Sequence, residues 1–173
     1  FAGVVSLIGQ AAWAQPPAID TFFRRPAFSH AALAPGGLRL AFLVAAKGSR
    51  TQLAVLDLQS MQPAVVGSFK DADVRSFRWV NDQRLVFDLH AELTGVGRVA
   101  LGHGLFAVNH DGSGFRQLAE TQQTFVKAPP AGVELLPWNT YLLGDAGPQD
   151  SDHVFVVRPL EQSARSVDYI RLQ

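Results

Sequence analysis

The stretch that decides the fold reads Arg78-Trp79-Val80-Asn81-Asp82-Gln83-Arg84-Leu85-Val86-Phe87. Polar residues at 75, 76 and 78 interrupt the apolar residues of 74–80, which favours a half-buried strand, and an apolar run follows at 85–89. The Asn, Asp and Gln between the two runs favour a tight turn. The stretch therefore predicts a pair of consecutive antiparallel strands.

The same order of turn and strand recurs on both sides, in residues 34–42 (APGGLRLAF) and 150–157 (DSDHVFVV). Each copy is followed by a second apolar strand, at Leu53–Leu58, Leu105–Asn109 and Tyr169–Leu172. The interval from Gly36 to Asp82 is close to the length of one four-stranded propeller blade, about 40–50 residues. The next interval is longer and requires an insertion, for which residues 92–103 and 124–137 are the candidates.

Short runs of β-forming residues separated by turn residues fill the rest of the chain from residue 34 onward. An Asp-Gly pair at 111–112 predicts a hairpin, because glycine accepts the positive φ that such a turn needs. Only residues 18–25 could form a short helix. The expected strands are 38–46, 51–58, 63–69, 74–80, 85–89, 105–109, 115–118, 133–143, 153–157 and 167–172. The fold class predicted is all-β, a partial β-propeller of about three four-stranded antiparallel blades. Three blades cannot close a ring, so this propeller is expected to be incomplete.

The N-terminal segment has a different character. No charged residue precedes Asp20, and an apolar stretch at 1–8 leads to the small residues of Ala12-Trp13-Ala14. This pattern is typical of the end of a secretory signal peptide, with cleavage after Ala14; a buried N-terminal helix or strand is the alternative. We therefore divide the chain into a signal-peptide remnant (1–14), a lead-in (15–33) and an incomplete propeller domain (34–173), and expect export to the periplasm or beyond.

Composition limits the functions open to the chain. Its 173 residues carry 15 basic and 15 acidic side chains, so the formal net charge is zero, and 47% of residues are hydrophobic. A protein built mainly to bind nucleic-acid phosphates usually has a basic excess, so nucleic acid is not an expected partner. The chain contains no cysteine, which excludes disulfides, thiolate metal sites and thiol nucleophiles. The apolar N-terminal stretch is too short for a membrane span.

These motifs, taken in order, resemble the N-terminal β-propeller region of bacterial serine peptidases of the prolyl oligopeptidase family. The dipeptidyl-peptidase and acylaminoacyl-peptidase branches are most similar. Residues 34–42 are similar to the S-P-D-G-K-x-x-A-F element of this family and of TolB-like propellers, with Ala34 and Gly36 in place of Ser and Asp. That departure removes side-chain capping of the turn and keeps its shape. The resemblance covers roughly residues 19–172.

The resemblance implies a function in two parts. The propeller would restrict access so that only short peptides reach the active site, and a C-terminal α/β-hydrolase domain in the same polypeptide, outside this chain, would supply the Ser/Asp/His triad. The alternatives are a TolB-like periplasmic propeller that binds proteins without enzymatic activity, and an inactive truncated product. No cofactor is implied.

Catalytic and metal-binding patterns are not found in the sequence. No Gly-x-Ser-x-Gly nucleophile elbow occurs; Ser113 comes nearest, but it lies in the predicted hairpin. The five histidines lack the i, i+4 spacing with Glu that zinc hydrolases use, so no metal site is predicted. Catalytic residues are therefore not expected within this chain.

Two observations concern possible binding residues. By strict alternation Arg75 and Arg78 point to opposite faces of their strand, so no basic row is expected there. Acidic propeller residues can hold the amino terminus of the substrate in exopeptidases of the family. Glu92, in the loop after a predicted strand, is the candidate for that role, with plain loop solvation as the alternative.

Overall fold

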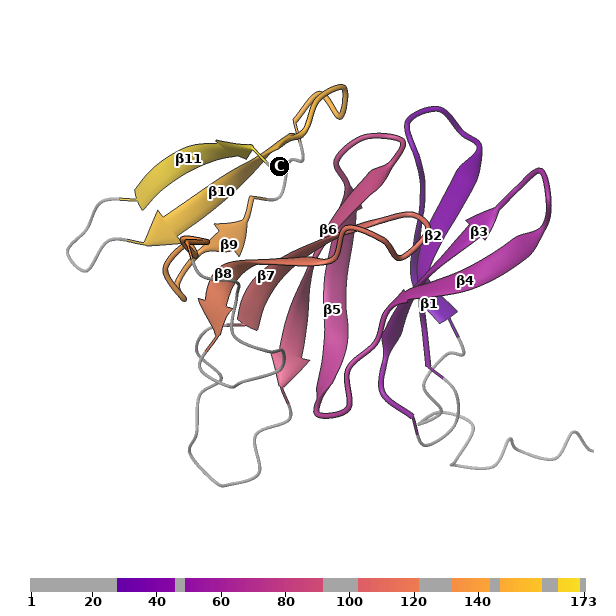
Figure 1. Cartoon of the computed structure of the whole chain (residues 1–173), viewed down its shortest axis with the longest axis horizontal. Coiled ribbons are helices and arrows are strands. Elements are labelled where there is room, and N and C mark those ends of the chain that lie inside the picture. Colours follow the sequence, from indigo (N-terminus) through magenta and orange to yellow (C-terminus); the bar gives the residue numbers. More distant parts are fainter. Residues whose placement is uncertain are drawn as a thin grey trace, which may run out of the picture.

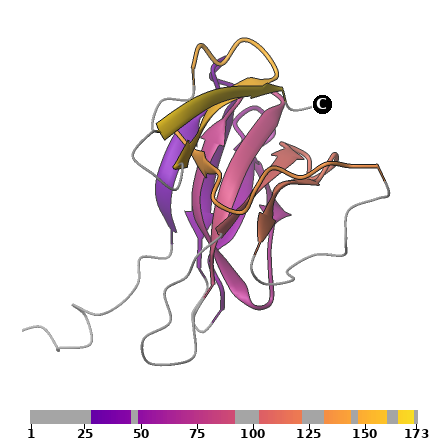
Figure 2. The same ribbon diagram turned by 90° about the vertical axis from the view of Figure 1, so that its left-hand side faces the viewer.

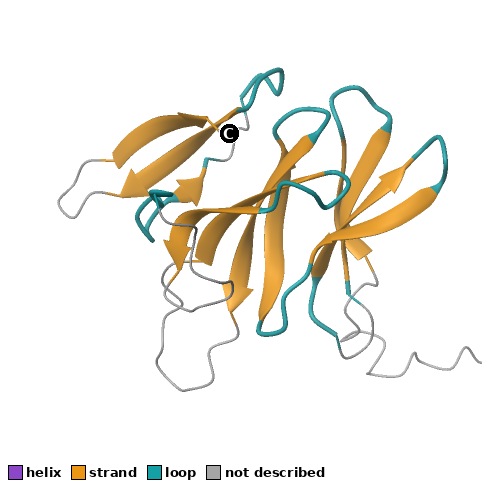
Figure 3. Cartoon of the chain, in the orientation of Figure 1, coloured by secondary structure: helices purple, strands orange, loops and turns teal. Residues whose placement is uncertain are grey.

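The computed structural model describes residues 28–45, 49–91, 103–121, 132–143, 147–159 and 165–171. This part of the chain contains strands and loops and no helix (Figure 3). It includes no helix that is both long and apolar enough to cross a membrane. The strands are β1 Phe28–Leu33, β2 Arg39–Val44, β3 Gln52–Asp57, β4 Gln62–Gly67, β5 Ala72–Trp79, β6 Arg84–Ala91, β7 His103–Asn109, β8 Arg116–Thr121, β9 Tyr141–Leu142, β10 His153–Pro159 and β11 Arg165–Arg171.

The strands form three antiparallel sheets that follow one another along the chain. The first sheet has the order β1-β2-β3-β4 and the second β5-β6-β7-β8, while β9, β10 and β11 make the third. Within each sheet every strand pairs with its neighbour in sequence, as a meander requires. The predicted all-β, antiparallel architecture is thus confirmed, and the described strands do not close into a ring.

The sheets lie side by side, with the second between the other two (Figure 1). When the molecule is turned by 90°, the three sheets lie behind one another, and the third sheet is nearest the viewer (Figure 2). One apolar core fills the space between the first and second sheets, around Trp79, Phe87 and Phe106. Another lies between the second and third sheets, around Val86, Leu105 and Val154.

The second sheet is therefore covered on both faces, which explains the run Leu85-Val86-Phe87. Leu85 and Phe87 belong to the core shared with the first sheet, and Val86 to the core shared with the third. All three side chains are fully buried. A strand covered on one face alternates apolar and polar residues, whereas one covered on both faces reads as a continuous apolar run.

The turn at residues 81–83 joins the three sheets at their upper ends in Figure 1. Asn81 Oδ1 accepts hydrogen bonds from the backbone of Gln83 and Arg84 at 2.9 and 3.0 Å, which shapes the predicted turn. On one side, Gly36 N donates to Asp82 Oδ1 at 2.6 Å. On the other, Asn81 Nδ2 donates to Asp152 Oδ1 at 2.7 Å. Neighbouring sheets are thus connected through the turns that precede their second strands.

Gly36 occupies a position at which the peptidase family that the sequence resembles has Asp. The turn at Gly36 is instead capped by Asp82, a residue of the second sheet. Gly37 N donates to Ala34 O at 2.9 Å, so the turn keeps its shape as expected. A Cβ at Gly36 would lie 2.9 Å from both carboxylate oxygens of Asp82. The absence of a side chain therefore allows the carboxylate of the second sheet to reach this backbone.

Three features differ from the strands expected from the sequence. β1 lies in the segment 15–33 that we read as a lead-in; its Ser, His and Ala residues have little β-propensity, and pairing with β2 decides its conformation. Residues 133–143, expected as one strand, yield only β9 and an isolated parallel bridge between Leu136 and Ala119, because Pro137 interrupts the segment. The proposed signal peptide and the possible helix at 18–25 lie outside the described residues.

Candidate functional site: a basic face on the second sheet

A β-bulge in β5 changes which side chains share a face of the second sheet. The register moves from Val74 opposite Leu89 to Ser76 opposite Asp88, so Arg75 is the extra residue. Such a bulge interrupts strict alternation. Arg75 contacts Asp88, and Arg78 lies opposite Val86 on the same face as Asp88. The expectation that Arg75 and Arg78 point to opposite faces was therefore wrong.

Arg75 and Asp88 form an ion pair at this bulge. Asp88 is only 5% exposed, and its Oδ2 accepts hydrogen bonds from Nε and Nη2 of Arg75, the former at 3.1 Å. Its Oδ1 accepts from the backbone N and the hydroxyl of Ser76, at 3.0 and 2.7 Å. The hydrogen bonds to the Asp88 carboxylate raise the pKa of Arg75. Arg75 thus supplies the hydrogen bonds and the opposite charge that the Asp88 carboxylate needs beside an apolar core.

Two further arginines, Arg84 and Arg116, lie on the same face as Arg78, and we call these three residues the basic face. Directly opposed residues of paired strands point to the same side of a sheet. Arg78 lies opposite Val86, Arg84 opposite Asn109, and Arg116 opposite Ala107. Val86 and Ala107 both belong to the core under the third sheet, which fixes the side. Three strands therefore bring three cations to the face that the third sheet partly covers, and all three side chains are half-buried there.

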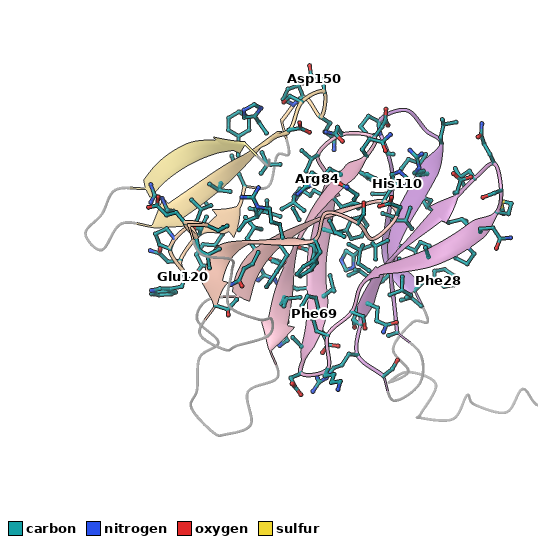
Figure 4. All side chains as sticks on the ribbon, viewed as in Figure 1. Phe28, Phe69, Arg84, His110, Glu120 and Asp150 are labelled. Carbon is teal, nitrogen blue, oxygen red and sulfur yellow. The ribbon has the colours of Figure 1, made fainter. Side chains whose placement is uncertain are left out.

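Arg84 is held by neutral groups. Its Nη1 donates to Asn109 Oδ1 at 2.9 Å and its Nη2 to the carbonyl of Gly114 at 3.3 Å. Its Nε is buried and has no hydrogen-bond partner within the described ranges. Burial lowers the pKa of Arg84, and the nearby charge of Arg116 lowers it further, while Asp152 acts in the opposite direction. Figure 4 labels Arg84 near the middle of the molecule.

A hollow lies between the β4–β5 connection and the β7–β8 hairpin. Its volume is about 560 Å³, and Phe69, Lys70, Asp71 and Phe115 contribute to its lining. The Phe69 and Phe115 rings are 6.2 Å apart, and both approach Phe87 of the core. Figure 4 shows Phe69 below Arg84. The side chains packed against this hollow thus belong to the interface of the first two sheets.

The residues that the sequence analysis considered for substrate binding or catalysis do not come together in the part of the chain that the structure describes. Glu92 lies outside the described residues, so its role stays a prediction. Ser113 lies in the predicted hairpin turn, where its hydroxyl donates to Asp111 Oδ1 at 2.6 Å and accepts from Asn109 Nδ2 at 3.0 Å. That hydroxyl shapes the turn. No group of three or more metal-ligating side chains occurs in the described ranges.

Sequence reasoning missed the basic face because its members come from three strands, one of which has a bulge that interrupts strict alternation. One signal was present in the sequence, the recurrence of arginine at the start of three strands, at Arg39, Arg84 and Arg116. Only the strand register shows which of these share a face.

The chain is similar to known proteins in its fold, and no similarity was found at the level of sequence families. No protein-family model matches the chain, and no curated protein matches it. A proposed conserved lipoprotein from Clostridium novyi NT has a similar structure, with a TM-score of 0.53 at 10% identity, over 87% of this chain and 90% of that chain. The acylaminoacyl peptidase of Pyrococcus horikoshii matches with a TM-score of 0.50 at 15% identity, over 85% of this chain and 25% of that chain.

These similarities concern the arrangement of strands. The chain spans a quarter of the length of the Pyrococcus horikoshii enzyme. At such identities a shared fold does not carry function with it. The comparisons therefore establish an all-β fold that also occurs within a peptidase.

Proposed function

We propose that this chain forms the first blades of a β-propeller in an exported serine peptidase of the prolyl oligopeptidase family, where it controls the admission of short peptides. The observation that carries the proposal is the order of the sheets. Each antiparallel sheet is complete before the next begins, and successive sheets pack face to face. Radial repetition of such sheets is the principle of a propeller.

The packing between sheets supports the assignment of blades. The first strand of the second sheet, β5, packs against β1, the first strand of the preceding sheet. The outer strand β4 packs against β7. β5 also packs against β3, and β9 of the third sheet packs against β7, so each sheet contacts the next along the chain as neighbouring blades do.

A peptidase with this propeller needs a catalytic domain elsewhere in its polypeptide. The fold similarity to an acylaminoacyl peptidase over a quarter of that enzyme agrees with such a division. The nucleophile, the general base and the oxyanion hole would then all belong to the hydrolase domain. The role left to this chain is to select the peptides that reach that domain.

Glu92 is the proposed contact for the substrate within this chain. It directly follows β6, in the connection to β7. A carboxylate there would bind the ammonium group of a peptide amino terminus by a charge-assisted hydrogen bond. Glu92→Gln would raise KM for peptides with a free amino terminus and leave KM for blocked peptides unchanged.

The test uses the whole product of the gene that contains this chain. The purified protein is treated with a fluorophosphonate probe, which labels activated serine nucleophiles, and is assayed on short peptides and on a folded protein substrate. We expect labelling, cleavage of the short peptides and no cleavage of the folded protein. Absence of labelling would overturn the peptidase proposal, and equal cleavage of the folded protein would overturn the gating role.

A second function is favoured by one observation. The proposed lipoprotein from Clostridium novyi NT shares the fold over 90% of its own chain. A module of this kind can therefore occur in a protein of similar extent, which fits a TolB-like propeller that binds a periplasmic protein and has no enzymatic activity. Recovery of a specific protein partner together with absent probe labelling would support this alternative.

A further inference from the structure

The basic face of Arg78, Arg84 and Arg116 lacks a matching set of carboxylates. None of the three has an ion pair with an acidic residue in the described part of the chain, whereas Arg39, Arg50 and Arg75 each do. Two acidic side chains lie close by, and neither forms an ion pair with the three arginines, although the charge of Asp152 acts on Arg84. Asp88 binds Arg75, and Asp152 accepts from Asn81.

Arg84 is the central member of this group, since its strand lies between those of Arg78 and Arg116 in the sheet order. Its side chain is half-buried. Two of its five N–H donors are used, and both acceptors are uncharged. The buried Nε has no acceptor among the described residues. A guanidinium is thus held in one orientation by Asn109 and Gly114 without an ion pair, and the carboxylate of Asp152 acts on its charge only from a longer distance.

Arg116 adds a second positive charge beside it. Two like charges that are partly removed from water destabilise each other unless an anion lies between them. The proximity of the two guanidinium groups is reflected in the lowered pKa of Arg84. Planar guanidinium groups bind carboxylates through paired N–H···O hydrogen bonds.

We propose that the basic face binds an acidic peptide segment, with one carboxylate between Arg84 and Arg116 and a neighbouring carboxylate at Arg78. Spacing over three strands suits a ligand with several anionic groups better than a single ion. The choice of a peptide over a nucleic acid rests on the zero net charge of the chain and on the proposed function. The face would then favour substrates or partners that are rich in Asp and Glu.

The experiment measures binding of hexaglutamate to the whole gene product by isothermal titration calorimetry at low salt, with hexaglutamine as the uncharged probe. We expect binding of hexaglutamate alone, weakened by added salt. Arg116→Gln and Arg84→Gln should each weaken it about tenfold. Lys70→Gln, which removes an exposed cation from the hollow between the first two sheets, is the matched control and should leave the affinity unchanged.

Several outcomes would overturn the inference: equal binding of the two peptides, equal affinity of Arg116→Gln and Lys70→Gln, or binding of a single-stranded oligonucleotide in preference to hexaglutamate. If Arg84→Gln fails to fold, Arg116→Gln decides, because its side chain makes no hydrogen bond with another described residue. Fluorophosphonate labelling of the same samples separates the two proposals. Labelling without hexaglutamate binding refutes this inference alone, and binding without labelling refutes the peptidase proposal alone.

Discussion

Replacing Asp88 by Asn tests whether the Arg75 pair fixes the bulge of β5. The substitution keeps the size of the side chain, and its Oδ1 can still accept from Ser76. Its amide group, however, replaces the oxygen that receives Nε and Nη2 of Arg75, so donors would face donors. We therefore expect the bulge to lose its ion pair while its backbone hydrogen bond to Ser76 remains.

The magnitude follows from the burial of the two partners. Breaking a fully buried ion pair by removing one charge costs about 3–5 kcal/mol. Arg75 is 44% exposed on its side chain, so water can solvate the released guanidinium, and the expected loss falls to about 2–3 kcal/mol. The free energy of unfolding would be measured by urea titration, followed by the fluorescence of the buried Trp79.

The matched control is Asp71→Asn, which makes the same chemical change at an exposed carboxylate without a hydrogen-bond partner in the described part of the chain. It should alter stability by less than about 0.5 kcal/mol. Arg75→Gln combined with Asp88→Asn should cost less than the sum of the single substitutions, with a coupling energy of at least about 1 kcal/mol. Additive effects, or equal losses for Asp88→Asn and Asp71→Asn, would refute the reasoning.

Three other predictions can be checked in the same assay. Gly36→Ala should destabilise by about 1–2 kcal/mol, because its Cβ would displace the carboxylate of Asp82; the loss should vanish in an Asp82→Ala background, and its persistence there would contradict the proposed contact. Phe87→Ala should cost about 3–5 kcal/mol, since a fully buried ring leaves a cavity between the first two sheets; a loss below 1 kcal/mol would place the ring outside the core. Hydrogen bonds from Ser60 lower the pKa of Asp57, so this carboxylate stabilises the fold above its unfolded pKa of about 4 and that stabilisation is lost as pH falls through the lower folded value. Asp57→Asn should therefore reduce the acid sensitivity of stability, and an unchanged pH profile would argue against this turn.

Local sequence patterns were sufficient for the turns and for most strands. Asn81 shapes its turn with its own side chain, and Gly112 has a φ of 85° in the hairpin that its Asp-Gly pair predicts. These conformations depend on residues within a few positions of one another. Local propensity failed at β1, whose residues 29–32 have little β-propensity, because its pairing with β2 determines the outcome.

Contacts between sheets could not be read from local pattern. The hydrogen bond from Gly36 to Asp82 joins two turns in different sheets. The sequence shows that Gly36 departs from the pattern of the peptidase family that it resembles, and only the structure shows that the carboxylate of Asp82 occupies the space. Trp79 likewise donates from its indole nitrogen to Ala32 O at 3.0 Å, in a strand that the sequence did not indicate.

The candidate site was missed for a related physical reason. Period-two alternation assigns faces correctly only where every residue has a partner across the ladder. One additional residue reverses the assignment for everything on its far side, so a bulge at Arg75 brings that side chain to the face of Arg78. The bulge itself is stabilised by Asp88, thirteen residues away on the neighbouring strand. Asp88→Asn should therefore weaken hexaglutamate binding, because loss of the bulge would change the face on which Arg78 lies; unchanged binding would show that the bulge does not orient Arg78.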